Sequence, residues 1–348
     1  MVAVLGGAGA ACLIALLAIR GGADEPGAVA PIVWRDPAPP APAASADGGR
    51  QSAEAVEASS GVSVVRPSGE AAPGAIVIAV PAAPALAPHP DARLVERTRF
   101  GLLPRVGEDG ARPARVYARP AAPGAGPKVA VAVGGLGIGQ TATAEAIAKL
   151  PPAITLAFAP YGSDLERSVK QARDAGHEVM LQVPMEPFDY PAHDPGPHTL
   201  TVGAKPQQNI ERLHWLMSRF TGYTGLMTFM GAKLTADESA LAPVLEEAGA
   251  RGLLVLDDGS SGRSLIRNGA VAQGATLRAQ AVLDAVPRPE AIERELARLE
   301  QAARDRGFAI GTASALPLSV ERIARWAAAL EEKGIALVPV SALAEGRR

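Results

Sequence analysis

The stretch KVAVAVGGLGIGQTATAEAIAKL, residues 128–150, decides the fold of this chain. Residues 129–133 are a continuous apolar run with the length and Val content of a buried strand. A turn rich in Gly follows, and residues 141–150 have the pattern of a helix. A buried strand, a tight turn and a helix form the first half of a β–α–β unit, in which successive strands run parallel.

The same alternation continues along the rest of the chain. The pairs Ser163 with Glu166 and Thr235 with Glu238 have the spacing of a capping box, and Pro206 suits the first position of a helix. We expect strands at residues 154–158, 178–183, 226–229, 253–256, 281–283, 309–311 and 335–338. We expect helices from 163 to about 176, from 206, from 235, over 290–306 and over 319–333.

Seven or eight β–α units fit a closed or nearly closed (β/α) barrel, and they also fit an open doubly wound sheet. In both architectures the carboxyl ends of the strands meet at one edge, where loops carry the functional groups. We therefore expect one α/β domain over residues 128–345, with its chemistry at the strand ends.

The N-terminal segment is apolar. Residues 2–19 carry no charge and end at Arg20. As a helix they span about 27 Å, close to the roughly 30 Å hydrocarbon core of a membrane. Residues 1–20 are therefore predicted to be a membrane anchor or signal segment, with a buried apolar helix as the alternative. This predicts a single-pass protein of the inner membrane whose folded domain lies in the periplasm.

Residues 21–127 have a different composition. Residues 38–44 consist only of Ala and Pro, and Trp34, Phe100 and Tyr117 are the only aromatic residues of the segment. Such a segment buries too little apolar surface to offset the entropy of ordering. We predict a disordered linker that is rich in Pro and Ala.

Charge and cysteine content exclude some classes of function. The chain has 348 residues and a net charge of −2, which argues against a nucleic-acid partner. Cys12 is the single cysteine, so an internal disulfide framework and a zinc site built from cysteines are excluded.

The Gly-rich turn resembles a phosphate-binding loop in part. Gly134, Gly139 and Thr141 have P-loop spacing, but Gln140 stands where the lysine that contacts phosphates is needed. A tight turn packed under a helix is the favoured interpretation, and nucleotide binding is the alternative.

Acidic residues follow two of the predicted strands. Asp257 and Asp258 come directly after the strand at 253–256, and Asp284 follows the strand at 281–283. The adjacent pair suits a general base or a cation ligand, and it equally suits the capping of a turn.

A long loop rich in Pro follows the strand at 178–183. It carries Glu186, Tyr190, His193 and His198. The two histidines with an acid could hold a metal ion, although histidines in loops are usually solvated.

The order of motifs resembles the divergent polysaccharide deacetylase family over about residues 128–343. The motifs are GLG at 135–137, LP at 150–151, LAFAPY at 156–161, GHEV at 176–179, VPMEP at 183–187, MG at 230–231, LD at 256–257 and 283–284, AIG at 309–311 and LVP at 337–339. The resemblance implies a distorted (β/α) barrel of the glycoside hydrolase/deacetylase type and a polysaccharide or envelope glycan as partner. It also implies a divalent ion such as Zn²⁺, held by a strand-end Asp and histidines, that activates water against an N-acetyl group.

This chain departs from the family pattern at the metal ligands. The family's Asp pair corresponds to Gly134 and Gly135, and the His before Pro-Met corresponds to Gln182. Its Asn-His corresponds to Thr228-Phe229, and its final His corresponds to Thr312. Neutral side chains are poor ligands for such an ion, so no metal site and no cofactor are predicted.

The remaining chemistry gives two competing functions. In one, the domain is a hydrolase in carbohydrate metabolism whose base is Asp257 or Asp258, with Glu186, Tyr190, His198 and Asp284 binding substrate. In the other, it is a non-catalytic protein that binds glycan or acts as a scaffold.

Overall fold

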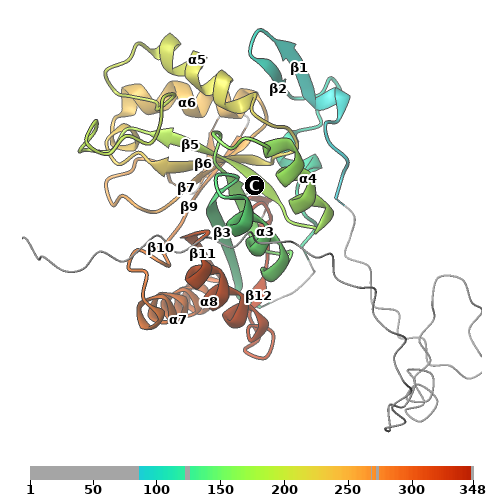
Figure 1. The fold of residues 1–348 in the computed structure, drawn as a ribbon, viewed down its shortest axis with the longest axis vertical. Helices are drawn as coiled ribbons and strands as arrows, with labels where there is room; N and C mark the ends of the chain where they lie inside the picture. The colour runs from blue at the N-terminus through green and yellow to red at the C-terminus, as the bar shows by residue number, and fades with distance from the viewer. Residues whose placement is uncertain (1–85, 122–125, 268, 272–273, 346–348) are drawn as a thin grey trace, which may run out of the picture. The chain divides into compact units, whose positions relative to one another are not determined.

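The computed structural model describes residues 86–121, 126–267, 269–271 and 274–345. These residues contain a ten-stranded sheet that curls around itself (Figure 1). Its order is β10–β11–β3–β4–β5–β6–β7–β9–β8, with β12 paired to β3, and every pair is parallel except β8 with β9. The strands are β3 Lys128–Leu136, β4 Thr155–Phe158, β5 Val179–Met185, β6 Gly225–Met230, β7 Leu254–Asp257, β8 Gly269–Val271, β9 Gly274–Arg278, β10 Ala281–Val282, β11 Phe308–Ser314 and β12 Ala336–Leu337.

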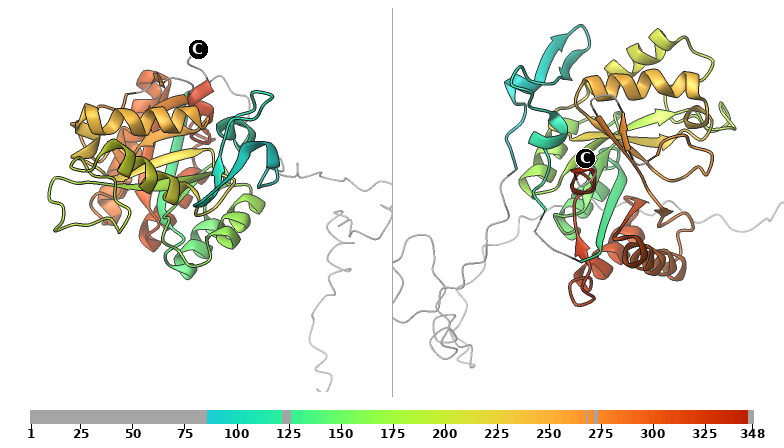
Figure 2. Two further views of the ribbon diagram at one scale, coloured as in Figure 1. Left: turned by 90° about the horizontal axis from the view of Figure 1, so that it is seen from above. Right: turned by 180° about the vertical axis from the view of Figure 1, so that it is seen from behind.

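The strand order does not return to its start, so the sheet is a half-barrel rather than the closed barrel among the sequence expectations. Helices follow most strands and lie on the outside of the curl (Figure 2). They are α3 Gln140–Lys149, α4 Leu165–Asp174, α5 Pro206–Met217, α6 Glu238–Ala250, α7 Pro289–Arg306 and α8 Pro317–Ala328. The short helix α9, Ala342–Glu345, instead packs against the inner side of the sheet. The parallel α/β architecture predicted from the sequence is confirmed.

Alternation along the strands separates two apolar layers. In β3, Val129, Val131 and Val133 belong to the large outer cluster, which contacts the helices. Ala130 and Ala132 belong to the smaller inner cluster. Side chains alternate between the two faces of a strand, so the pattern Val-Ala-Val-Ala-Val places bulky groups outside and small ones on the concave side.

Helix starts agree with the sequence only in part. Pro206 opens α5 as predicted. Neither predicted capping box forms. Helix α4 has Asp164 at its N-cap, and Asp237 caps α6 by accepting a hydrogen bond from the backbone N–H of Ala240 at 2.9 Å. The Thr235 hydroxyl instead donates to the carbonyl of Gly231 at 2.7 Å.

Residues 86–121, which the sequence assigned to the linker, are folded. They form a 3-10 turn at Ala92–Leu94, the hairpin β1 Val95–Thr98 and β2 Gly101–Pro104, and the short helix α2 Pro113–Val116. Leu94 and Leu103 are fully buried. The buried Arg173 guanidinium donates to the carbonyls of Ala87, Tyr117 and Gly222 at 2.7, 3.1 and 2.9 Å. These contacts attach the segment to the domain, and the sequence expectation is corrected over this range.

The predicted anchor at residues 1–20 and the linker up to residue 85 lie outside the described residues. Among the helices that the structure does describe, none has both the length and the apolar character needed to cross a membrane.

Candidate functional site

The turn Asp257–Ser260 lies where β7 ends, at the carboxyl edge of the half-barrel. Asp257 is buried, and its Oδ1 accepts a hydrogen bond from the backbone N–H of Gly259 at 2.8 Å. Its Oδ2 accepts no hydrogen bond within the described residues, and Arg278 Nε lies 3.9 Å away. Asp257 therefore keeps one buried carboxylate oxygen without a hydrogen-bond donor in the described part of the chain, opposite the Arg278 guanidinium.

Two threonines, one from β6 and one from β11, hold the backbone of Asp258. The Asp258 N–H donates to Thr228 Oγ1 at 2.9 Å, and the Asp258 carbonyl accepts from the Thr312 hydroxyl at 2.6 Å. The carboxylate accepts from the backbone N–H of Ser260 at 2.9 Å. Burial, with the Asp257 charge as a smaller cause, raises the pKa of Asp258 to about 6.

Gln182 occupies the space under the Gly-rich turn after β3. Its Oε1 accepts from the Gly135 N–H at 2.6 Å. A Cβ on Gly134 would lie 2.4 Å from Gln182 Nε2, so Gly at this position leaves room for the amide. The Gly137 N–H donates to Thr143 Oγ1 at 2.9 Å. These internal bonds agree with the favoured interpretation of a packed tight turn.

Two predicted substrate-binding acids have internal partners. Asp284 Oδ2 accepts from the Ser314 N–H at 2.8 Å and the Ser319 hydroxyl at 2.7 Å. Glu186 pairs with Lys233 Nζ at 2.6 Å and accepts from the Val202 N–H at 2.6 Å. Both acids are buried and hold loops at the carboxyl edge. Their role in binding stays a prediction.

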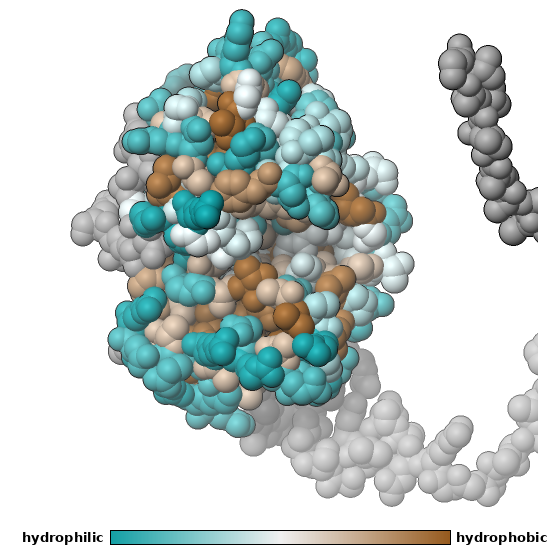
Figure 3. Space-filling view, turned by 90° about the vertical axis from the view of Figure 1, so that its left-hand side faces the viewer, coloured by the Kyte–Doolittle hydropathy of each residue, from teal (hydrophilic) through white to brown (hydrophobic). Residues whose placement is uncertain are grey.

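Exposed apolar side chains surround the carboxyl edge, and the sequence analysis missed them. Each lies at the end of a strand or in the loop that follows it, and we call the set the apolar rim. Its members are Ile138, Phe188, Phe229, Leu265, Val286 and Leu316. Figure 3 shows apolar patches on both sides of a central hollow on this side of the molecule. Their placement after six different strands was the signal in the sequence.

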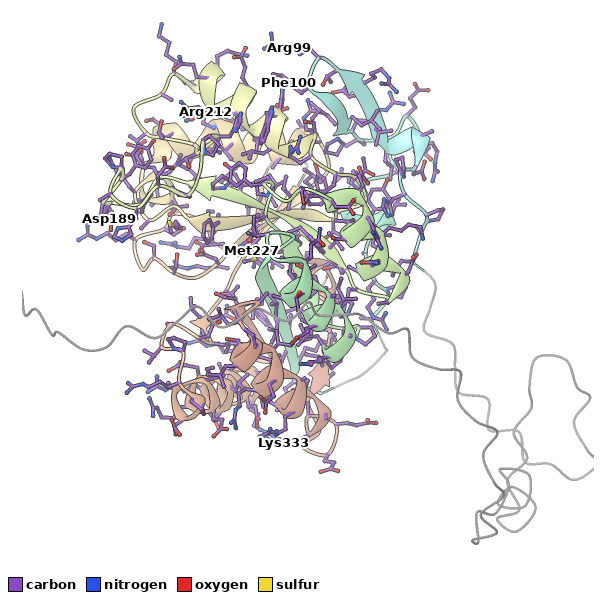
Figure 4. The ribbon with its side chains drawn as sticks, in the orientation of Figure 1. Arg99, Phe100, Asp189, Arg212, Met227 and Lys333 are labelled. Atoms are coloured by element: carbon purple, nitrogen blue, oxygen red, sulfur yellow. The ribbon has the colours of Figure 1, made fainter. Side chains whose placement is uncertain are left out.

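The loop after β5 separates the histidines that the sequence considered together. His193 pairs with Asp189 at 2.5 Å near the outer end of the loop (Figure 4). The His198 ring stacks on Trp215, with ring centroids 3.6 Å apart, and the backbone N–H of His198 donates to the Tyr161 hydroxyl at 3.2 Å. Burial lowers the pKa of His198.

His198 is thus part of an aromatic stack. Tyr190, the other predicted binding residue of the loop, is half-buried and precedes Pro191.

Metal ligands do not assemble in the part of the chain that the structure describes. No group of three or more His, Cys, Asp or Glu side chains lies there in an arrangement that could hold an ion. The neutral side chains of Thr228 and Thr312 bond the backbone of Asp258, and that of Gln182 bonds the backbone of Gly135.

Two solved structures are similar to this chain, and the first of them supports the architecture. The uncharacterized protein ATU2773 of Agrobacterium tumefaciens C58 is 45% identical, has a TM-score of 0.67, and covers 70% of this chain and 99% of its own. A protein of Enterococcus faecalis V583, named for a suggested role in cellobiose-phosphate cleavage, is 12% identical with a TM-score of 0.46 and covers 63% of this chain and 99% of its own. No curated protein matches the chain.

The family model for divergent polysaccharide deacetylases matches residues 131–344, which contain nearly all of the half-barrel. This match confirms the resemblance drawn from the motifs, and the chain belongs to the divergent polysaccharide deacetylase family.

Proposed function

We propose that the domain binds a polysaccharide at the carboxyl edge of its strands and does so without a resident divalent ion. The apolar rim around the acidic turn Asp257–Asp258 is the observation that supports a glycan ligand. Sugar rings offer C–H faces to apolar and aromatic side chains, and their hydroxyls donate to carboxylates. Met230, next to Phe229, has a positive φ of 60°, the kind of backbone strain that clusters at binding sites.

The donor set supports a degenerate metal site. Divalent ions of this family's kind are held by carboxylates and imidazoles. Gln182, Thr228 and Thr312 supply neutral oxygens, and each is already engaged with backbone groups. These residues do not fit the ion, and no step of the proposed function uses one.

Hydrolysis is the second candidate function. The Oδ2 of Asp257, which accepts no hydrogen bond within the described residues, and a pKa of about 6 at Asp258 suit a general base at neutral pH. In that case Asp257→Asn abolishes release of acetate from an acetylated polysaccharide.

The purified chain distinguishes the two functions. We expect binding to immobilised polysaccharides that is unchanged by a chelator. We also expect zinc well below one equivalent by elemental analysis, and no release of acetate. One bound equivalent of metal, together with acetate release that Asp257→Asn removes, contradicts the proposal. Phe229→Ala is expected to weaken glycan binding about tenfold, because it removes an exposed aromatic contact. Phe100→Ala, on the β1–β2 hairpin away from the carboxyl edge, is the control.

We also propose a location in the cell envelope. The support is the uncharged run at residues 2–19. The full chain is expected in the membrane fraction after cell breakage, and a variant without residues 1–20 is expected in the soluble fraction. Recovery of both in the soluble fraction contradicts this location.

A further inference from the structure

A cavity of about 610 Å³ lies at the open seam of the half-barrel, between the segment that joins β9 to β10 and helix α7. This volume is within the range of sites for small molecules or for one unit of a larger ligand. Gly259, whose N–H binds Asp257, also lines it. The cavity therefore adjoins the acidic turn of the carboxyl edge.

Guanidinium groups dominate the lining of the cavity. Arg267, Arg278, Arg298 and Arg306 line it from three separate segments, and Glu295 is the one acid among its described lining residues. Glu295 pairs with Arg298 at 2.6 Å, in an ion pair whose arginine side chain is 70% exposed. Exposed pairs of this kind contribute little and exchange readily. The cavity therefore keeps an excess of positive charge.

Two of the arginines are positioned by the backbone around them. Arg278 donates to the Ser261 carbonyl at 2.6 Å, while its Nε faces Asp257. Arg267 donates to the Ile266 carbonyl at 3.1 Å. Arg298 and Arg306 lie on the same face of α7, eight residues apart, and both are exposed. The cavity is thus lined by two guanidinium groups that backbone carbonyls hold in place and by two that are exposed on α7.

We propose that this cavity binds an oxyanion carried by the glycan, either a carboxylate or a sulfate or phosphate ester, so that the ligand of the carboxyl edge is an acidic polysaccharide. The inference rests on the proposed function and adds the charge class of its ligand. Guanidinium groups present paired N–H donors that match carboxylate and phosphate geometry. An apolar rim beside a cationic cavity fits a chain that alternates sugar faces with negative groups.

The test uses the full chain and three polymers with one backbone: dextran, carboxymethyl-dextran and dextran sulfate. We expect Arg306→Gln to lower the affinity for at least one charged polymer about tenfold, because a hydrogen bond to a charged group is lost. Arg304→Gln removes the same charge from the last turn of α7, but Arg304 binds the Lys333 carbonyl and does not line the cavity. We expect Arg304→Gln to change the affinity by less than about twofold, because this charge lies outside the cavity. A loss of affinity for carboxymethyl-dextran identifies a carboxylate as the bound group, and a loss for dextran sulfate identifies an ester.

Equal losses in the two variants indicate unspecific attraction to positive charge and overturn the inference, as does an unchanged affinity in Arg306→Gln. Phe229→Ala separates the inference from the proposed function. If Phe229→Ala weakens binding while Arg306→Gln does not, the cavity inference fails and the carboxyl-edge function stands. If only Arg306→Gln weakens binding, the cavity holds the anion and the proposed carboxyl-edge function fails.

Discussion

Asp258 links the stability of the domain to pH. Burial raises the pKa of its carboxyl to about 6 from an ordinary value of 3.8. The folded state then holds the proton more tightly than the unfolded state. The stability that protonated Asp258 contributes is therefore fully present below about pH 4 and is lost as pH rises through about 6. Ionisation of this one side chain therefore destabilises the fold at neutral pH.

Asp258→Asn tests this effect. Asn keeps an oxygen for the Ser260 N–H and removes the charge. We expect the free energy of unfolding to rise by about 1–2 kcal/mol at pH 7.5 and to stay unchanged at pH 4. Urea unfolding at the two pH values measures the difference. An equal change at both would show that ionisation is not the cause.

The site could be predicted from the sequence only as far as its strand ends. Asp257 and Asp258 follow an apolar run, and the structure places them at the end of a strand, as predicted. The partners of Asp258 come from β6 and β11, 30 and 54 residues away in sequence, so their contact depends on strand register that no local pattern shows. Asp284 and Glu186 look equally free in the sequence, yet both have internal partners.

At the scale of elements, an ion-pair network joins the hairpin to α5 and α6. Glu247 accepts from His214 Nε2 at 2.6 Å and from Arg251 at 2.5 Å. Arg251 also pairs with Glu96 of β1 at 2.8 Å. The hydrogen bond from His214, followed by Arg251, lowers the pKa of Glu247 to about 2.

Glu247→Gln should weaken this junction. The pKa of Glu247 is lower in the folded state than in the unfolded state. The stability that ionised Glu247 contributes is therefore present above the ordinary pKa of 4.5 and is lost as pH falls through about 2. We expect a loss of about 1–2 kcal/mol at pH 7, where the pair is half-buried, and a smaller loss at pH 3. Glu145→Gln, in an exposed pair with Lys149, is the control in urea unfolding. A loss that does not shrink at low pH contradicts the assignment.

The elements themselves were largely predictable, but the strands β8 and β9 and the hairpin β1–β2 were not expected from the sequence. The expected strands and helices from residue 128 onward appear within a few residues of their predicted bounds, because each is a periodic apolar run. The hairpin β1–β2 was missed, because four-residue strands beside Pro and Gly carry little pattern. The hairpin and the residues before it are held by partners far away in the sequence: Arg251 bonds the Pro104 carbonyl and Arg173 bonds the Ala87 carbonyl.

At the scale of the whole molecule, the C-terminal segment fills the concave side of the sheet. Val340 and Leu343 belong to the inner apolar cluster. Thr155 Oγ1 accepts from the Val340 N–H at 3.0 Å, and Glu178 accepts from the Ser341 N–H at 3.2 Å. The curl therefore has an interior that the chain itself occupies.

Leu343→Ala is expected to lower the free energy of unfolding by about 2–4 kcal/mol, because it opens a cavity in that interior. The same substitution at Leu316, 44% exposed on the apolar rim, should change stability by less than about 0.5 kcal/mol. Thermal unfolding compares the two variants. Similar losses would mean that the inner cluster is not a packed core.

The unclosed sheet has a consequence for how the width of this scaffold can vary. In a closed barrel each strand has two neighbours, so a wider circumference breaks a ladder of hydrogen bonds. Here β9 and β10 are joined by a short covalent connection, in which Gln280 bonds to Ile310 of β11. A longer connection between β9 and β10 would therefore widen the curl without breaking any strand pair of the sheet.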